Sequence, residues 1–73
     1  MTIRLVNTTY NNAGAAINHY RVEIRNVGAM VTMNTNTEKF RMTLFKRPLT
    51  LSIAKAKNVI AEEVQAQLST TFN

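Results

Sequence analysis

The chain has 73 residues, no cysteine and a net charge of +5 at pH 7. This length fits one small domain, which buries only roughly 60% of the surface of its unfolded chain, and the lack of cysteine excludes disulfides and thiolate metal sites. We therefore expect close packing or a homodimer to supply stability. No run is long enough to cross a bilayer and the N-terminus has no apolar signal core, so we expect no membrane partner. The absence of cysteine suits a cytoplasmic protein.

The excess positive charge lies in the first two thirds of the chain. Residues 1–48 contain seven Lys or Arg and two Glu, a net charge of +5, whereas residues 49–73 contain two of each. This asymmetry indicates an acidic partner, which could be nucleic acid, an acidic protein surface or anionic lipid. The alternative is that a charge of this size only keeps a small domain soluble.

Alternating polar and apolar residues predict two strands in the first third, over residues 2–8 and 17–25. Their apolar positions are Ile3 and Leu5 in the first, then Tyr20, Val22 and Ile24 in the second. The Asn-Asn-Ala-Gly segment at residues 11–14 has the composition of a turn.

Two hairpins are predicted next. Gly28-Ala29 fits a two-residue loop, which would pair Ile24 with Met33 and Arg25 with Thr32. A second turn at residues 34–37 leads into a strand over residues 38–45, with Phe40, Met42 and Leu44 on one face. In that hairpin Val31 would face Phe40 and Ala29 would face Met42. Both hairpins place their apolar residues on one face of the sheet.

Residues 49–68 have the period of an amphipathic helix. Its apolar stripe comprises Leu49, Ile53, Ala56, Ile60, Val64 and Leu68, and Lys55, Asn58 and Glu62 lie opposite. Pro48 ends the last strand, Thr50 is the expected N-cap, and residues 69–73 are expected to fray.

These elements predict one α+β domain over residues 1–73. Residues 1–48 form an antiparallel meander of three to four strands, and residues 49–69 form a C-terminal helix packed on one face, in the order β-β-β-β-α.

Catalysis is not expected. His19 is the single histidine, and Glu23 lies on the same strand face roughly 13 Å away, too far for an acid–base pair. The sequence has no nucleophile motif, glycine-rich phosphate loop or metal-ligand spacing. We therefore predict a non-enzyme without cofactor or metal.

A basic surface is the main candidate site. Its expected members are Arg4, Arg21, Arg25, Lys39, Arg41, Phe45, Lys46, Arg47, Lys55 and Lys57. Most of them fall on the sheet face turned away from the helix, where arginines could hold phosphates or carboxylates and rings could contact bases. The alternative is an ordinary solvated face, because outward positions of half-buried strands are usually charged.

Four of these cations flank the predicted start of the helix, at residues 46, 47, 55 and 57. Positive charge opposes the helix dipole there, whereas an anion would be favoured by the dipole and by free backbone N–H groups. The sequence therefore suggests an anion site at this junction, unless the long side chains only extend into water.

Surplus apolar residues indicate a second buried surface. Val6, Met30 and Phe45 point away from the predicted core, and Leu51 and Val59 lie off the helix stripe. A dimer interface or a partner groove rimmed by arginine would use them.

The leading hypothesis is a non-enzymatic module that occupies an acidic surface of a macromolecular partner. In size and style, small basic cysteine-free proteins of this kind look like the accessory proteins with which bacteriophages block host nucleases, polymerases and CRISPR complexes. Such an inhibitor would act in the cytoplasm of the bacterial host. The alternatives are a nucleic-acid-binding protein of low sequence specificity and a structural or assembly subunit.

Overall fold

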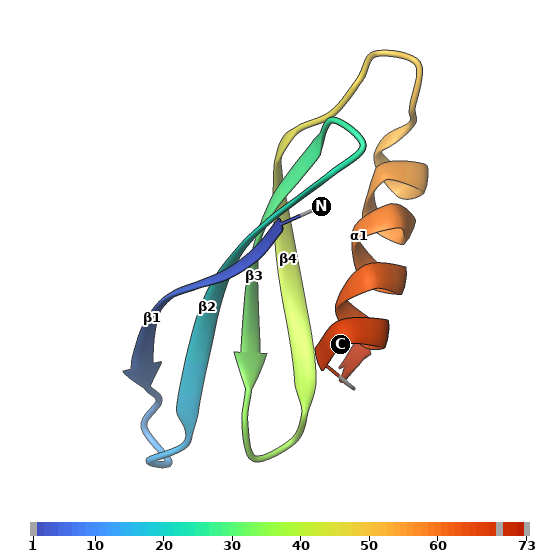
Figure 1. Ribbon diagram of the computed structural model, residues 1–73. Coiled ribbons are helices and arrows are strands. Elements are labelled where there is room, and N and C mark those ends of the chain that lie inside the picture. The colour runs from blue at the N-terminus through green and yellow to red at the C-terminus, as the bar shows by residue number, and fades with distance from the viewer. Residues whose placement is uncertain (1, 69, 73) are drawn as a thin grey trace.

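The computed structural model describes residues 2–68 and 70–72, which form one twisted sheet and one helix (Figure 1). The elements in chain order are β1 (Thr2–Tyr10), β2 (Ala16–Ile24), β3 (Val27–Asn34), β4 (Lys39–Lys46), α1 (Ile53–Leu68) and β5 (Thr71–Phe72). The predicted α+β class and the β-β-β-β-α order are confirmed. Among the described residues, no helix is long and apolar enough to cross a membrane.

The strands follow one another across the sheet in the order β1-β2-β3-β4-β5. The first four are antiparallel, and β1 pairs with β2 from Thr2 to Tyr10. β5 is parallel to β4, with Thr71 beside Lys39 and Phe72 beside Phe40, so the prediction of fraying is wrong for these two residues. Thr70, which is buried, donates its hydroxyl to the carbonyl of Glu38 and so ties this segment to the sheet. Ser69 and Asn73 lie outside the described residues.

The β2–β3 turn differs from the prediction. It consists of Arg25 and Asn26, with φ of 50° and 64°, and Ile24 pairs with Val27. Two consecutive positive φ angles match the twist of a hairpin, and Asn tolerates this conformation. The partner of Ile24 is thus six residues away from the predicted Met33. Because six is even, the apolar residues still share one face.

The β3–β4 hairpin is also shifted, here by two residues. Val31 pairs with Met42 and Ala29 with Leu44. The turn extends through Glu38, which has a φ of 59° and donates its N–H to the carbonyl of Asn34 at 2.8 Å. The longer turn moves the start of β4 to Lys39, and the even shift again preserves the apolar face.

Two β-bulges interrupt the pairing. One lies at Val6, between the pairs that Leu5 and Asn7 form with β2. The other lies at Phe45, because Ala29 pairs with Leu44 while the preceding Gly28 pairs with Lys46. Each bulge adds an unpaired residue and increases the local twist of the sheet.

The core lies between the sheet and α1 (Figure 1). Its buried residues are Val22, Ile24, Val27, Ala29, Val31 and Phe40 of the sheet, with Ala56, Ile60 and Val64 of the helix. These three helical positions and the partly buried Leu68 confirm four of the six residues of the predicted stripe. Ile53 is 55% exposed and lies outside the core. Leu49 does not belong to it, since it lies in the preceding loop with 96% of its surface exposed.

α1 begins later than predicted because Ser52, and not Thr50, is its N-cap. The Ser52 hydroxyl accepts the N–H of Lys55 at 3.2 Å, and its carbonyl accepts the N–H of Ala56 at 2.9 Å. Leu51 and Val59 pack against the core, so they are not surplus apolar surface as predicted.

Candidate functional site

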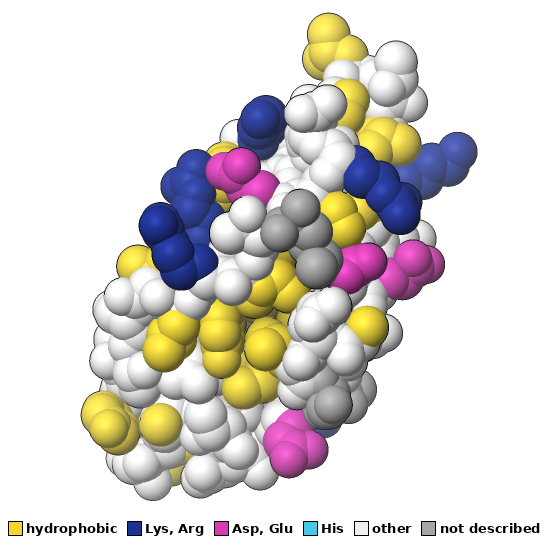
Figure 2. Space-filling model, in the orientation of Figure 1, with side chains coloured by type: hydrophobic (Ala, Val, Ile, Leu, Met, Phe, Trp, Pro, Cys, Tyr) yellow, Lys and Arg dark blue, Asp and Glu magenta, His cyan; other side chains and the backbone are white. Residues whose placement is uncertain are grey.

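The candidate site is the outer face of the sheet, which we define as the face opposite α1. Strand pairing aligns its side chains in rows, one of which runs from Arg4 through Arg21 and Met30 to Thr43. Five cations and one carboxylate occupy this face: Arg4, Arg21, Lys39, Arg41, Lys46 and Glu23. Figure 2 shows Lys and Arg side chains at both the left and the right of the upper half of the molecule.

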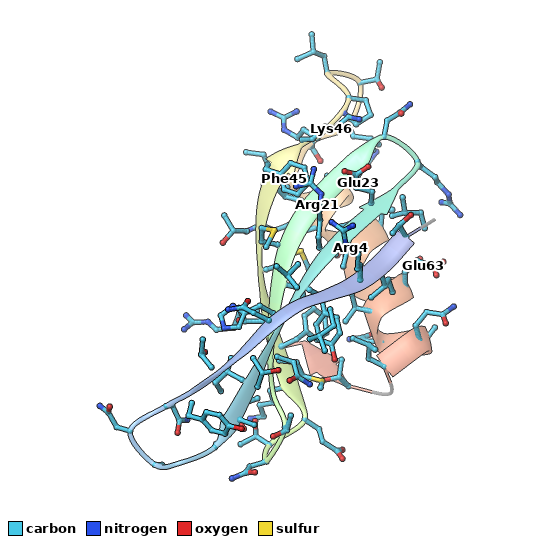
Figure 3. The ribbon with its side chains drawn as sticks, turned by 60° about the vertical axis from the view of Figure 1, so that its left-hand side comes forward. Arg4, Arg21, Glu23, Phe45, Lys46 and Glu63 are labelled. Atoms are coloured by element: carbon cyan, nitrogen blue, oxygen red, sulfur yellow. The ribbon has the colours of Figure 1, made fainter. Side chains whose placement is uncertain are left out.

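The Arg21 side chain is held by contacts to both Phe45 and Glu23 (Figure 3). Its guanidinium carbon lies 4.5 Å from the centroid of the Phe45 ring. Its Nη2 and Nε atoms donate to Oε1 of Glu23 at 3.0 and 3.3 Å. The ring and the carboxylate therefore fix the plane of the guanidinium, although an ion pair at such half-exposed positions adds at most about 1 kcal/mol of stability.

The bulge at Phe45 places its ring over Gly28. A Cβ atom added to Gly28 would lie 2.6 Å from Cε1 and Cζ of this ring, so no side chain fits there without displacing it. The stack therefore depends on a glycine near the start of β3. The sequence contained this signal, because an isolated glycine in a strand pattern indicates a bulge or a close approach.

Arg4 lies directly opposite Arg21, which places like charges on adjacent strands. Arg21 and Glu23 form the only ion pair among the described residues, so the charge of Arg4 has no carboxylate partner. A hollow of about 210 Å³ lies between the two arginines, Thr2 and Glu23. An incoming carboxylate or phosphate would relieve the repulsion there.

A second hollow, of about 350 Å³, lies at the opposite end of the outer face. Its lining residues are Ile17, Thr32, Asn34, Thr37, Lys39 and Arg41. Two cations, two hydroxyls and an amide line it, and no carboxylate does. Its composition therefore also favours an anionic group.

The predicted junction site is assembled only in part. Lys46, Arg47 and Lys57 line one groove with Ile53, whereas Lys55 is exposed and does not line it. Arg47 donates to the carbonyl of Leu51 at 2.7 Å. Because the Ser52 side chain accepts the N–H of Lys55, the helix N-terminus itself is capped and offers less to an anion than predicted.

Arg25 and Lys55 lie away from the outer face. Arg25 is in the β2–β3 turn and not on a strand as predicted, and Lys55 is on the solvent side of α1. Lys39, Arg41, Arg4 and Arg21 are on the outer face as the alternation predicts.

No catalytic constellation is formed by the described residues. His19 Nε2 lies 2.8 Å from the hydroxyl of Thr9, and the carboxylate of Glu23 contacts Arg21. In the same part of the chain, no three His, Asp or Glu residues are grouped to hold a metal ion.

No protein-family model, curated protein or solved structure matches this chain.

Proposed function

We propose that this protein is a non-enzymatic binding module whose outer face occupies an acidic surface of a partner protein. The observation that carries the proposal is the charge of this face, where five cations meet one carboxylate that already contacts Arg21. The helix covers the other face, so these cations are available to a partner.

The arrangement of Phe45 favours a protein partner over base stacking. Arg21 covers one face of its ring, and Cε1 and Cζ of the ring lie close to Gly28. A base that stacked on the face covered by Arg21 would have to displace the guanidinium. Together, Arg21, Phe45 and the half-exposed Met30 instead form a small anchor of the kind found at the centre of protein interfaces.

A phage-type inhibitor of host nucleic-acid machinery is one form that such a module could take. The small size and the basic face support it, because a compact cationic surface is attracted to an acidic surface of such a partner. The assembly-subunit alternative predicts indifference to acidic polymers.

Direct nucleic-acid binding is the second candidate. The two anion-favouring hollows at opposite ends of the outer face support it, since they could contact separate phosphates. Such binding would weaken steeply with salt, because each neutralised phosphate releases counterions.

The test compares poly-glutamate with single- and double-stranded DNA and RNA, each titrated at two salt concentrations. The variant Arg4→Glu/Arg41→Glu reverses two charges on the outer face. Arg25→Glu/Lys55→Glu reverses two charges elsewhere on the protein. Its net charge equals that of the first variant, so it is the matched control. We expect poly-glutamate affinity to fall by roughly tenfold or more in the first variant and by less than about threefold in the control.

Equal losses in both double variants would contradict a localised site. Tighter binding of nucleic acid than of poly-glutamate, lost on Phe45→Ala, would favour base stacking and the second candidate. Loss on Phe45→Ala that is confined to a protein partner favours the first.

A further inference from the structure

β4 has an open edge. β3 pairs with β4 along one side, whereas β5 pairs with its other side only at Lys39 and Phe40. Within the described part of the chain, residues 41–46 have no strand on that side. Alternate residues of this segment, which spans about 20 Å, therefore direct backbone N–H and C=O groups toward the open edge.

A groove of about 490 Å³ runs beside this edge. One wall is the consecutive segment from Met42 to Arg47, and the other is the first part of α1, at Ile53 and Lys57. No β3 residue lines the groove, which places it on the unpaired side of β4. The chain itself already adds a short strand, β5, to the same edge, so the edge is accessible to an extended segment.

The charge of the groove indicates the kind of segment that fits. Lys46, Arg47 and Lys57 line it, and no carboxylate does. A second copy of this edge would bring six cations together, so self-pairing is opposed, whereas an acidic strand is attracted.

We propose that this groove binds an extended acidic segment of the partner protein, which adds to β4 as a further strand. This inference rests on the proposed function and specifies how the partner is recognised. Backbone hydrogen bonds to residues 41–46 would supply affinity, and the side chains along the groove would supply specificity.

The two sides of the edge differ, which predicts the pattern of the bound segment. Met42 and Leu44 face the helix side, where Ile53 is 55% exposed. Arg41 and Lys46 lie on the outer face. Because side chains of a strand alternate, the preferred segment has apolar residues alternating with Asp or Glu, with the acidic ones toward the outer face.

The test uses three fluorescent hexapeptides. The first is Glu-Val-Glu-Val-Glu-Val, the second has the same composition in two blocks, and the third is the alternating peptide with alternate backbone nitrogens methylated. We expect the alternating peptide to bind tightest and N-methylation to weaken it by roughly tenfold or more, because methylation removes backbone donors. Its binding should slow amide exchange at alternate residues between 41 and 46.

Lys46→Glu, with Lys46→Gln as a milder second variant, should weaken the alternating peptide by roughly tenfold, because Lys46 lines the groove on its outer side. Lys55→Glu is the control with the same change of charge, since Lys55 is exposed and outside the groove, and it should change binding by less than about twofold.

Equal affinity for all three peptides, or unchanged amide exchange at residues 41–46, would overturn strand addition. If poly-glutamate still binds and is released by Arg4→Glu/Arg41→Glu, the proposed function survives that result. If no acidic probe binds, both the proposed function and this inference are wrong.

Discussion

Three residues from three strands decide the local shape of the outer face. Gly28 of β3 leaves the space into which the bulged Phe45 of β4 folds, and Arg21 of β2 covers the ring. None of the three residues is unusual in its own strand. They shape the outer face only because they contact one another. The cluster is therefore expected to respond cooperatively to substitution.

A double-mutant cycle tests this dependence. Gly28→Ala should lower the free energy of unfolding by roughly 1–2 kcal/mol, because the new methyl group displaces the Phe45 ring. In a Phe45→Ala background the same change should be neutral or stabilising by up to about 1 kcal/mol, since alanine restricts the unfolded strand more than glycine does. Urea denaturation of the wild type, the two single variants and the double variant gives the coupling free energy between the two positions. Equal effects of Gly28→Ala in both backgrounds would show that the Phe45 ring does not lie over Gly28.

At the scale of elements, α1 is defined by its cap and by one buried side. Ser52 ends the loop by accepting the N–H of Lys55, and the buried positions Ala56, Ile60 and Val64 follow at helical spacing. The loop before it exposes Leu49 almost fully. The helix therefore starts where a cap and a core contact coincide, and not where the apolar pattern starts.

Substitution of Ser52 and of Thr50 shows which of the two residues caps α1. Ser52→Ala should lower the free energy of unfolding by about 1 kcal/mol, because the N–H of Lys55 loses its partner. Thr50→Ala should change it by less than about 0.5 kcal/mol. Thermal denaturation followed by circular dichroism measures both, and a larger effect at Thr50 would contradict the helix start described above.

The buried side of α1 is tested by a charge. Ile60 is completely buried, so Ile60→Asp should lower the free energy of unfolding by at least about 4 kcal/mol, much of the roughly 4–11 kcal/mol expected for a chain of this length. Glu62 is exposed two residues later on the opposite side, and Glu62→Ala should be nearly silent. Indistinguishable melting curves of the two variants would mean that α1 does not pack against the sheet through the side that carries Ile60.

At the scale of the whole molecule, the two sheet faces have different roles. One packs against α1 and forms the core, and the other carries the cations. A third region is apolar: Figure 2 shows apolar side chains exposed between the sheet and the helix. A hollow of about 440 Å³ lies there, lined by Ile3, Leu5, Tyr20, Gln67 and Leu68.

The expected homodimer would use this apolar region and the free edge of β1. Leu5 and Val6 are 53% and 52% exposed there, and Arg4 is the only charge on β1, so two copies would meet with little repulsion. We expect sedimentation equilibrium to give a dimer mass that Leu5→Glu reduces to that of a monomer. Val6→Thr is the milder control, and a monomer at every accessible concentration would contradict this prediction.

The sequence by itself determined the class of the fold, the face on which the strand residues lie outside the two bulges, and the surface that carries most of the charge. Alternation with period two decides the face, and the two hairpin registers differed from prediction by six and two residues, even shifts that leave every face unchanged. Arg4, Arg21, Lys39 and Arg41 were predictable on the outer face for the same reason, whereas Lys46 reaches it only through the bulge at Phe45.

Only the tertiary structure decided the turns, the bulges, the start of α1, the addition of β5 and the groove at the β4 edge. These features depend on which strands meet and on how closely they approach. The stack of Arg21, Phe45 and Gly28 joins residues of three strands through a bulge, and the groove joins the end of β4 to the start of α1 across a loop. Local periodicity carries no information about such distances, because packing between segments sets them.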